Sequence, residues 1–458
     1  MEAKKRWEQT QFHERASVFW KAAELLTTKY RYEMLAATML GQGKTVWQAE
    51  IDCIAELADF WRLGCKFGEQ ILQQQPEIHA RGIWNRMDYR PLDGFVAAIG
   101  PFNFTAIGGN LASAPALMGN SVLWKPSSSA VYSNYLAYKI LEEAGLPPGV
   151  VQFVPADAKL FSNTVLAHPE FGGIHFTGSS DVLQLLWKQI ATNLPKYRAF
   201  PRIVGETGGK NMHFVHPTAN VISTVHHTIR AAFEYQGQKC SACSRLYLPK
   251  SLEKEFITRL VEEVKQIKVG HVKEFKNFMS AVVNKAAFDK INGYIKRASE
   301  DSKLGNEVKV LHGGNFSDKG GYFIEPFIVQ TTNPKYVTME EEIFGPFLTI
   351  CTYPDEEWEE MMKVAADTSP YALTCAIFGT DFEFIQKASS ILRYSAGNLY
   401  INDKCTAAVV GQQPFGGSRK SGTNDKAGSI LNLLRWTSPR CIKENYTTLD
   451  HWSYPSNE

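Results

Sequence analysis

The sequence predicts an α/β fold in which parallel sheets are covered by helices on both faces. Short apolar runs bounded by Gly, Pro and Asn alternate with helix-like segments, first over residues 94–176 and again over 211–402. This alternation is typical of βαβ units, which build parallel sheets. The runs are apolar throughout, as expected for strands that are buried on both faces. A chain of 458 residues usually forms more than one hydrophobic core.

Helices are expected before the first strand, because Val18, Ala22, Leu25 and Leu26 recur at helical spacing and a second stripe covers residues 47–72. The first βα series is predicted to have strands at 94–100, 121–125, 150–154 and 173–176 and helices at 105–117, 130–144 and 158–167. The second is predicted to have strands at 211–215, 244–248, 347–351, 373–379 and 397–402 and helices at 219–235, 251–267, 355–367 and 381–392. We therefore expect a domain boundary near Gly208-Gly209.

Two segments outside these series have a different pattern. Residues 81–93 alternate polar and large apolar side chains, as an exposed hairpin does, and residues 440–455 have a similar character. Both segments are rich in Trp, Tyr and Arg, residue types that are enriched at protein interfaces. We expect them to form an arm that contacts another subunit.

Composition and charge exclude several functional classes. The chain has 49 Lys and Arg against 47 Asp and Glu, a formal net charge of +2, so no strong field favours nucleic acid or anionic lipid. The uncharged stretch 94–124 is interrupted by Gly and Pro and is not expected to span a membrane. Eight scattered cysteines favour a reducing compartment. The acidic residues Glu2, Glu8 and Glu14 are typical of neither a signal peptide nor a transit peptide.

Familiar nucleotide and metal motifs are incomplete. LGQGKT (40–45) resembles a phosphate loop, but it lacks the first glycine and follows a helical stretch. The pattern GxGxxG does not occur, although a parallel sheet can bind a nucleotide without it. Cys240 and Cys243 form a CxxC with no second pair and no nearby histidine at metal-binding spacing. No metal site is predicted.

Oxidation of an aldehyde through a thioester requires a thiolate nucleophile, donors for the oxyanion, a carboxylate that activates water, and a nicotinamide held over the adduct. Cys240, Asn103 and Glu206 are side chains of these kinds. Each alone has an ordinary structural reading, as a small buried residue, a loop cap or a turn carboxylate. Their joint occurrence supports the chemical hypothesis. We expect Lys239 and nearby backbone dipoles to lower the pKa of Cys240.

Six motifs, taken in order, resemble those of the aldehyde dehydrogenase superfamily. FEYQGQKCSA (233–242) is similar to its cysteine signature, and GETGGKN (205–211) to its glutamate signature. The other four are PFNF (101–104), WKPS (124–127), FTGS (176–179) and EIFGP (342–346). The resemblance covers nearly the whole chain. Relative to the family pattern, the sequence begins inside the first long helices, without the usual N-terminal strands and presequence.

The resemblance implies a role for each matching residue. Cys240 would be the nucleophile, Glu206 the base, and Asn103 would donate to the oxyanion together with the Cys240 N–H. The cofactor would be NAD, bound by Gly100, Lys125, Gly178, Ser179, Ser180, Asp181, Val182 and Glu342. The substrate, a small-molecule aldehyde, would contact Glu56, Phe104, Ser241, Ala407, Ala408 and Phe415.

Three finer patterns are IGPFNFTAIGGNL (99–111), GQQPFGG (411–417) and SGTNDK (421–426). They resemble the family members that oxidise glutamate γ-semialdehyde to glutamate in the mitochondrial matrix. This reaction is the second step of proline degradation. Two departures stand out. Residues 127–129 are serines where the family often has an acidic residue that rejects NADP. Thr406-Ala407-Ala408 replaces Thr-Gly followed by Ser or Ala in the loop that binds the substrate carboxylate. We expect the N–H groups of residues 407 and 408 to bind this carboxylate, with Ala407 strained if it keeps a positive φ.

The resemblance divides the chain into a Rossmann-type NAD-binding domain (1–76, 94–209 and 412–435), an α/β catalytic domain (210–411) and an oligomerisation arm (77–93 and 436–458). It also implies a homodimer. Three alternatives stay open: another semialdehyde substrate, transfer of the acyl group to CoA, and a non-catalytic member of the family. The intact Glu206 motif weighs against CoA transfer, because that reaction needs no base to activate water.

Overall fold

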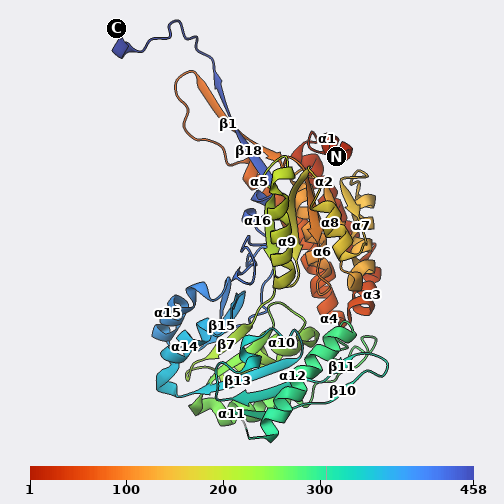
Figure 1. Ribbon diagram of the computed structural model, residues 1–458, viewed down its shortest axis with the longest axis vertical. Coiled ribbons are helices and arrows are strands. Elements are labelled where there is room, and N and C mark those ends of the chain that lie inside the picture. The colour runs from red at the N-terminus through yellow and green to blue at the C-terminus, as the bar shows by residue number, and fades with distance from the viewer. Residues whose placement is uncertain (306, 458) are drawn as a thin grey trace.

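The computed structural model describes residues 1–305 and 307–457 and confirms the predicted α/β class. A five-stranded sheet with its helices fills the upper half of the molecule, and a seven-stranded sheet with its helices fills the lower half (Figure 1). A two-stranded ribbon projects from the upper half and carries the C-terminus away from the body. No helix within the described residues is long and apolar enough to cross a membrane.

Helices precede the first sheet, as the periodicity predicts. They are α1 (Glu2–Trp7), α2 (Phe12–Thr27), α3 (Arg31–Gln42), α4 (Val46–Ala49), the π-helical turn η1 (Glu50–Glu56) and α5 (Leu57–Leu72). Their apolar faces form one core with α6 (Thr105–Leu117) and α7 (Val131–Ala144), in which Phe19, Leu57 and Trp61 are buried. The helical region therefore packs on one face of the first sheet.

The first sheet has the strand order β4-β3-β2-β5-β6, and all of its strands are parallel. The strands are β2 (Phe95–Ile99), β3 (Val122–Lys125), β4 (Val151–Phe153), β5 (Phe171–Thr177) and β6 (Arg202–Glu206). The helices α8 (Ala158–Val165) and α9 (Ser180–Asn193) complete the crossovers. The order reverses direction at β2, so the carboxyl ends of β2 and β5 border the crevice where such sheets bind a nucleotide.

The second sheet has the order β16-β15-β7-β8-β13-β12-β9, with only β9 antiparallel to its neighbour. Its strands are β7 (Asn211–Val215), β8 (Cys243–Pro249), β9 (Val308–His312), β12 (Phe327–Thr331), β13 (Phe347–Tyr353), β15 (Thr374–Phe378) and β16 (Asn398–Ile401). The accompanying helices are α10 (Val221–Phe233), α11 (Glu253–Val264), α12 (Lys285–Lys303), α13 (Val337–Glu340), α14 (Trp358–Asp367) and α15 (Phe382–Ile391). The elements β6, α12, β9 and β12 lie outside the set predicted from the sequence.

Short elements connect these units. They include β10 (Phe316–Ser317), β11 (Phe323–Ile324), β14 (Tyr371–Ala372), β17 (Ser418–Arg419) and α16 (Ile430–Leu434). The pair β14–β17 brings the segment after the second sheet back beside the end of β6, where Thr207 N–H donates to the Ser421 carbonyl at 3.0 Å. This return is what places residues from both halves around one cavity.

The arm differs from the expected hairpin. Residues 83–91 form the single strand β1 (Ile83–Pro91), which pairs antiparallel with β18 (Thr437–Asn445), so that Ile83 lies opposite Asn445 and Pro91 opposite Thr437. The expectation that residues 81–93 fold on themselves is therefore wrong. An alternating pattern identifies a strand, but it does not identify the partner strand, which here comes from the far end of the sequence.

Candidate active site

A cavity of about 540 Å³ opens between the helical region and the second sheet. All of the residues expected to contact substrate line it, together with the expected nucleophile and base; they are Glu56, Phe104, Glu206, Cys240, Ser241, Ala407, Ala408 and Phe415. These residues come from five separate parts of the sequence. The cavity has the size and the mixed apolar and polar lining of a small-molecule site.

Cys240 follows a turn whose backbone is held in the left-handed region. The turn η4 (Glu234–Gly237) contains Tyr235 at φ 53°, Gln236 at φ 58° and Gly237 at φ 67°. A Cβ on Gly237 would overlap the Gly345 carbonyl, so only glycine fits there. The Asn211 amide then donates to the Cys240 carbonyl at 2.7 Å and to the Ala242 carbonyl at 3.0 Å. The nucleophile segment is thus fixed by backbone contacts on both sides of Cys240.

The expected lowering of the Cys240 pKa is wrong. The Lys239 ammonium forms an ion pair with Glu234 at 3.0 Å, so the Glu234 carboxylate compensates the positive charge that was expected to act on Cys240. Burial, with smaller contributions from the Glu206 and Glu342 carboxylates, raises the pKa of the Cys240 thiol. The raised pKa favours the neutral thiol, so the Cys240 proton has to leave as the substrate is attacked.

Asn103 lies beside the turn that carries Cys240. It is 4% exposed, it precedes α6, and its side-chain amide donates to the Gln238 carbonyl at 3.1 Å. The neighbouring residue Phe104 lines the cavity. Asn103 itself is not among the residues that line the cavity, but its bond to Gln238 places an amide donor against the turn that carries Cys240.

Glu206 ends β6 and borders two spaces. It lines the main cavity and also a hollow of about 10 Å³ shared with Thr423, Asp425 and Lys426, which has room for about one water molecule. Its Oε1 atom has no hydrogen-bond partner among the described residues. Burial raises the pKa of Glu206 to about 8, while Lys426 opposes the rise and Asp425 adds to it. The carboxyl can therefore change protonation state near neutral pH.

The residues expected to bind NAD cluster at the carboxyl edge of the first sheet. Gly100 follows β2, Lys125 ends β3, and Gly178 follows β5, so three neighbouring strands deliver them to one edge. Ser179 caps α9 and its Oγ accepts from Val182 N–H at 3.3 Å. Asp181 and Val182 lie exposed in the first turn of this helix, and the Ser180 hydroxyl donates to that of Tyr371 at 3.2 Å. A helix N-terminus at such an edge suits a pyrophosphate, and a lysine suits ribose hydroxyls.

Glu342 is half-buried and contacts the backbone of the glutamate signature. Gly209 N–H donates to its carboxylate at 2.8 Å, and a Cβ on Gly208 would overlap that carboxylate. The Lys290 ammonium donates to the Glu342 carbonyl at 2.8 Å. Burial raises the pKa of Glu342, and the Gly209 N–H opposes this rise. The two glycines therefore bring the segments of Glu206 and Glu342 into contact.

The loop over residues 406–408 lines the cavity. Neither Ala407 nor Ala408 has a positive φ, so the condition under which Ala407 would be strained is not met. The start of the loop is fastened by Cys405, whose N–H donates to His213 Nε2 at 3.2 Å and whose thiol donates to the Ser241 carbonyl at 3.1 Å. The loop is thereby tied to the residue that follows the nucleophile.

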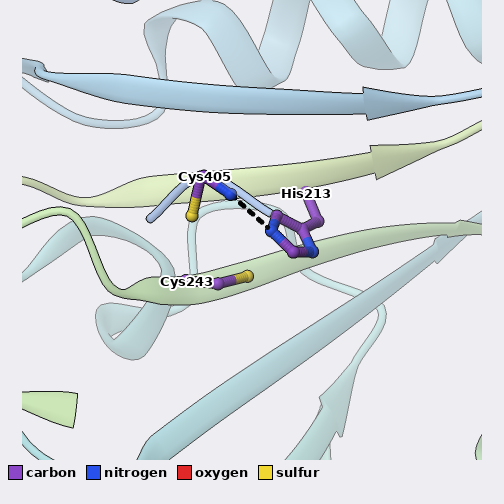
Figure 2. Close-up of side chains that lie close together, drawn as sticks. All are labelled: His213, Cys243 and Cys405. Carbon is purple, nitrogen blue, oxygen red and sulfur yellow. Dashed lines mark hydrogen bonds between the residues drawn. The ribbon is translucent and has the colours of Figure 1, made fainter. Parts of the chain in front are cut away.

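A buried group of His213, Cys243 and Cys405 was not predicted (Figure 2). Their potential ligand atoms lie within 4.8 Å of one another. His213 Nε2 already accepts from Cys405 N–H, and Nδ1 is bonded to the Thr228 hydroxyl at 3.0 Å. Both ring nitrogens are thus engaged with protein atoms, and the group serves to hold the loop. The CxxC spacing gave no signal of it, because the histidine and the second cysteine come from other segments.

Comparison with known proteins agrees with this arrangement. A profile of the aldehyde dehydrogenase family matches residues 1–441. The mitochondrial delta-1-pyrroline-5-carboxylate dehydrogenase of Dictyostelium discoideum is 55% identical over 457 residues, which are 99% of this chain and 81% of that protein. The mitochondrial enzyme of the same name from Homo sapiens is 52% identical over 453 residues, which are 99% of this chain and 80% of that protein.

Solved structures give the same result. The crystal structure of the delta-pyrroline-5-carboxylate dehydrogenase from Mycobacterium tuberculosis bound with NAD is 47% identical, covers 100% of this chain and 83% of its own, and has a TM-score of 0.94. The structure of the 1-pyrroline-5-carboxylate dehydrogenase from Thermus with bound NAD is 31% identical, with a TM-score of 0.89 over 97% of this chain and 84% of its own.

Proposed function

The chain belongs to the aldehyde dehydrogenase family, and from that premise we propose that it oxidises L-glutamate γ-semialdehyde to L-glutamate with NAD, the second step of proline degradation. The observation that carries this proposal is the single cavity that unites Cys240, Glu206 and the loop 406–408. The same chain matches delta-1-pyrroline-5-carboxylate dehydrogenases over nearly its full length.

The cavity suits an aldehyde that carries charged groups at its far end. Phe104 and Phe415 offer apolar surface to the methylene groups of the substrate. The backbone of Ala407 and Ala408 offers N–H groups to its carboxylate, and Glu56 offers carboxyl oxygens to its ammonium group. We assign the two alanines a positioning role through their backbone, which does not require a positive φ.

In the first step, the Cys240 sulfur forms a bond to the aldehyde carbon, the thiol proton passes to water in the cavity, and the π electrons of the carbonyl move to its oxygen. The charge that develops on the carbonyl oxygen is met by the Asn103 amide and the Cys240 N–H. The low dielectric of the buried site strengthens both hydrogen bonds. When bound, NAD supplies the hydride acceptor that allows a thioester to form on Cys240.

In the second step, Glu206 takes a proton from water as the water oxygen bonds to the thioester carbon. The carbon–sulfur bond then breaks, the proton held by Glu206 passes to the Cys240 sulfur, and the carboxylic acid product leaves the regenerated thiol. The unpartnered Oε1 atom of Glu206 gives this carboxyl the freedom to accept that proton. Its raised pKa makes it a stronger base than an exposed glutamate would be.

The residues present fit NAD. The capped N-terminus of α9 offers backbone N–H groups at the edge of the sheet, and the Lys125 side chain, which bonds only to the Pro126 carbonyl among the described residues, is available to ribose hydroxyls. Glu342 lies between this edge and the cavity, which suits a contact with the ribose that carries nicotinamide. The serines at 127–129 supply no negative charge against a 2′-phosphate, so the preference for NAD rests on the relatives.

We further infer a homodimer in the mitochondrial matrix. The support for the dimer is the projecting ribbon β1–β18 (Figure 1) and the aromatic residues at and beyond it, of which Trp84, Trp452 and Tyr454 are exposed. The support for the compartment is the word mitochondrial in the names of close relatives.

The direct test is NADH formation with glutamate γ-semialdehyde and with uncharged aldehydes of similar length. We expect kcat/KM to be highest for glutamate γ-semialdehyde, and Cys240→Ala to abolish turnover while Cys243→Ala, an equally conservative change three positions away, retains it. Equal turnover of the uncharged aldehydes would contradict the assigned substrate. Activity that survives Cys240→Ala would contradict the mechanism.

A further inference from the structure

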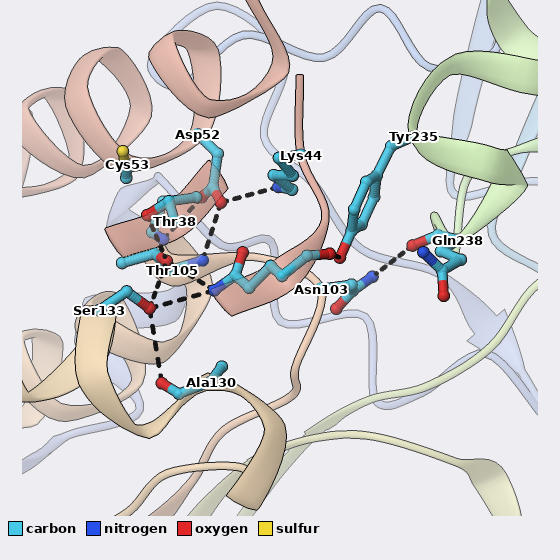
Figure 3. Close-up of polar contacts among 12 residues, drawn as sticks. Thr38, Lys44, Asp52, Cys53, Asn103, Thr105, Ala130, Ser133, Tyr235 and Gln238 are labelled. Carbon is cyan, nitrogen blue, oxygen red and sulfur yellow. Dashed lines mark hydrogen bonds and ion pairs between the residues drawn. The ribbon is translucent and has the colours of Figure 1, made fainter. Parts of the chain in front are cut away.

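An ion pair between Lys44 and Asp52 is buried beside the cavity (Figure 3). The Lys44 Nζ and Asp52 Oδ2 atoms are 2.7 Å apart, and their side chains are 1% and 0% exposed. A buried ion pair is weak evidence for stability, because the cost of removing two charges from water can exceed their attraction. Because stability alone does not explain the pair, its role is inferred from the contacts that Lys44 and Asp52 make with other residues.

Asp52 is bound to the start of the helix that follows Asn103. Its carboxylate accepts from Thr105 N–H at 2.9 Å and from Ala106 N–H at 2.8 Å. These are orphan donors in the first turn of α6, where a negative charge also meets the positive end of the helix dipole. Asp52 thus fixes the backbone directly after the Asn103-Phe104 segment.

Lys44 lies between aromatic rings from two different loops. Its ammonium is 3.8 Å from the ring centre of Phe104, which lines the cavity, and 4.7 Å from that of Tyr235. Tyr235 belongs to the left-handed turn that leads to Cys240. A cation held against two ring faces without water attracts both of them.

The backbone around Lys44 completes the connection. The Tyr235 hydroxyl donates to the Gln42 carbonyl at 2.9 Å, and the Gln236 amide donates to the Gly43 carbonyl at 3.0 Å. Gly43 has φ 69°, and a Cβ on it would crowd the Ala281 carbonyl. On the far side, the Asn103 amide donates to the Gln238 carbonyl. Residues 42–44 therefore contact both the nucleophile turn and, through Asp52 and Phe104, the segment that carries Asn103.

We propose that Lys44 is a positioning residue that sets the Asn103 amide against Cys240, by joining the Asp52-capped start of α6 to the turn before the nucleophile. The inference rests on the proposed function, since it concerns the alignment of the oxyanion donor with the attacking sulfur. It also gives a reason for Gly43 and Lys44 in the LGQGKT segment, whose likeness to a phosphate loop is a coincidence.

The test compares the pre-steady-state burst of NADH in four variants of the full chain. Lys44→Met removes the charge but keeps the length of the side chain, and Lys44→Met/Asp52→Asn leaves no unpaired buried charge. Lys4→Met is the matched control, because Lys4 is also buried and paired, with Glu8 at 2.7 Å, but lies in α1 away from the cavity. Asp52→Asn isolates the loss of the carboxylate. NAD affinity and Tm are measured for each protein.

We expect Lys44→Met and the double variant to slow the burst about 10- to 100-fold, at or below the effect of misplacing an oxyanion donor, with NAD affinity unchanged. The double variant should regain Tm relative to Lys44→Met but not the burst rate, and Lys4→Met should lose Tm only. A burst rate that recovers with Tm in the double variant would show a purely structural pair and overturn the proposal. If Lys44→Met does not fold, the double variant is compared with Asp52→Asn: a slower burst in the double variant supports the role of Lys44, and equal burst rates overturn it. Absence of NADH formation by the unmodified protein would instead count against the proposed function.

Discussion

Glu206 shows how a single buried carboxyl acquires the property that its task needs. Burial raises its pKa to about 8, and the unpartnered Oε1 atom leaves the charge uncompensated apart from the influence of Lys426. Since only the deprotonated carboxylate accepts a proton from water, hydrolysis of the thioester should be slow below this pKa and level off above it.

The first prediction is therefore a pH profile. The rate of the hydrolysis step, measured as turnover after the NADH burst, should fall about tenfold for each unit that the pH drops below about 8. Glu206→Gln should show the burst but almost no later turnover at any pH. A hydrolysis rate that is flat between pH 6 and pH 8 in the unmodified protein would mean that another group is the base.

A second prediction at this scale concerns Ala407. Because its φ is not positive, glycine at this position relieves no strain and mainly adds freedom to the unfolded chain. Ala407→Gly should leave KM for glutamate γ-semialdehyde within about twofold and lower the free energy of unfolding by about 0.5–1 kcal/mol. Steady-state kinetics and denaturant unfolding measure both quantities. A large fall in KM would show that the loop needs a left-handed residue after all.

Single-residue roles were predictable from the sequence only where a motif is local. Cys240, Glu206 and Asn103 stand in short patterns whose residue types already match the chemistry. The pKa of Cys240 was predicted in the wrong direction, because the partner of Lys239 and the depth of burial depend on the folded chain. His213 and Lys44 were missed for the same reason, since the Cys405 N–H bound by His213 and the Phe104 and Tyr235 rings beside Lys44 come from distant segments.

At the scale of elements, the capped helix α9 links sequence to cofactor binding. Ser179 accepts from Val182 N–H and sets the first turn that faces the crevice after β5. Loss of an N-cap costs about 0.5–2 kcal/mol, part of which should appear as weaker binding where the helix end meets an anion.

The third prediction follows from this cap. Ser179→Ala should raise the Kd for NAD about 3- to 30-fold. Asn220→Ala is the matched control, because Asn220 caps α10 through Ser223 N–H at 3.0 Å but lies in the second sheet's layer. Calorimetric titration with NAD measures both. If the two variants bound NAD with equal affinity, the N-terminus of α9 would not be part of the cofactor site.

Element prediction succeeded where strands are buried on both faces and bounded by Gly, Pro or Asn, as β2, β3 and β5 are. It failed at β9, an edge strand in which only Val308 is fully buried and Lys309 is exposed, and at α12, a helix in which only five of 19 residues are buried. β12 has the apolar run FIVQT and could have been found. Partner choice was not predictable, as the pairing of β1 with β18 shows.

At the scale of the whole molecule, the ribbon β1–β18 presents an extended polar and aromatic surface that the body of the protein does not cover. Leu449 and Trp452 beyond it are 85% and 81% exposed. Large exposed apolar side chains gathered on a projecting element are typical of a surface that another subunit covers.

The fourth prediction is that the full chain is at least a dimer at micromolar concentration, and that removal of residues 446–458 weakens the dimer without loss of the fold. Multi-angle light scattering gives the mass, and circular dichroism checks the fold. A monomeric full chain would contradict the role assigned to the arm.

The mechanism requires that a thioester forms on Cys240 and that its hydrolysis depends on the Glu206 carboxylate. The most direct measurement is mass spectrometry of the Glu206→Gln protein after mixing with NAD and glutamate γ-semialdehyde. We expect one glutamyl group on the peptide that contains Cys240, formed together with one equivalent of NADH and removed by hydroxylamine. An unmodified Cys240 after release of that NADH, or a glutamyl group on Cys243 instead, would contradict it.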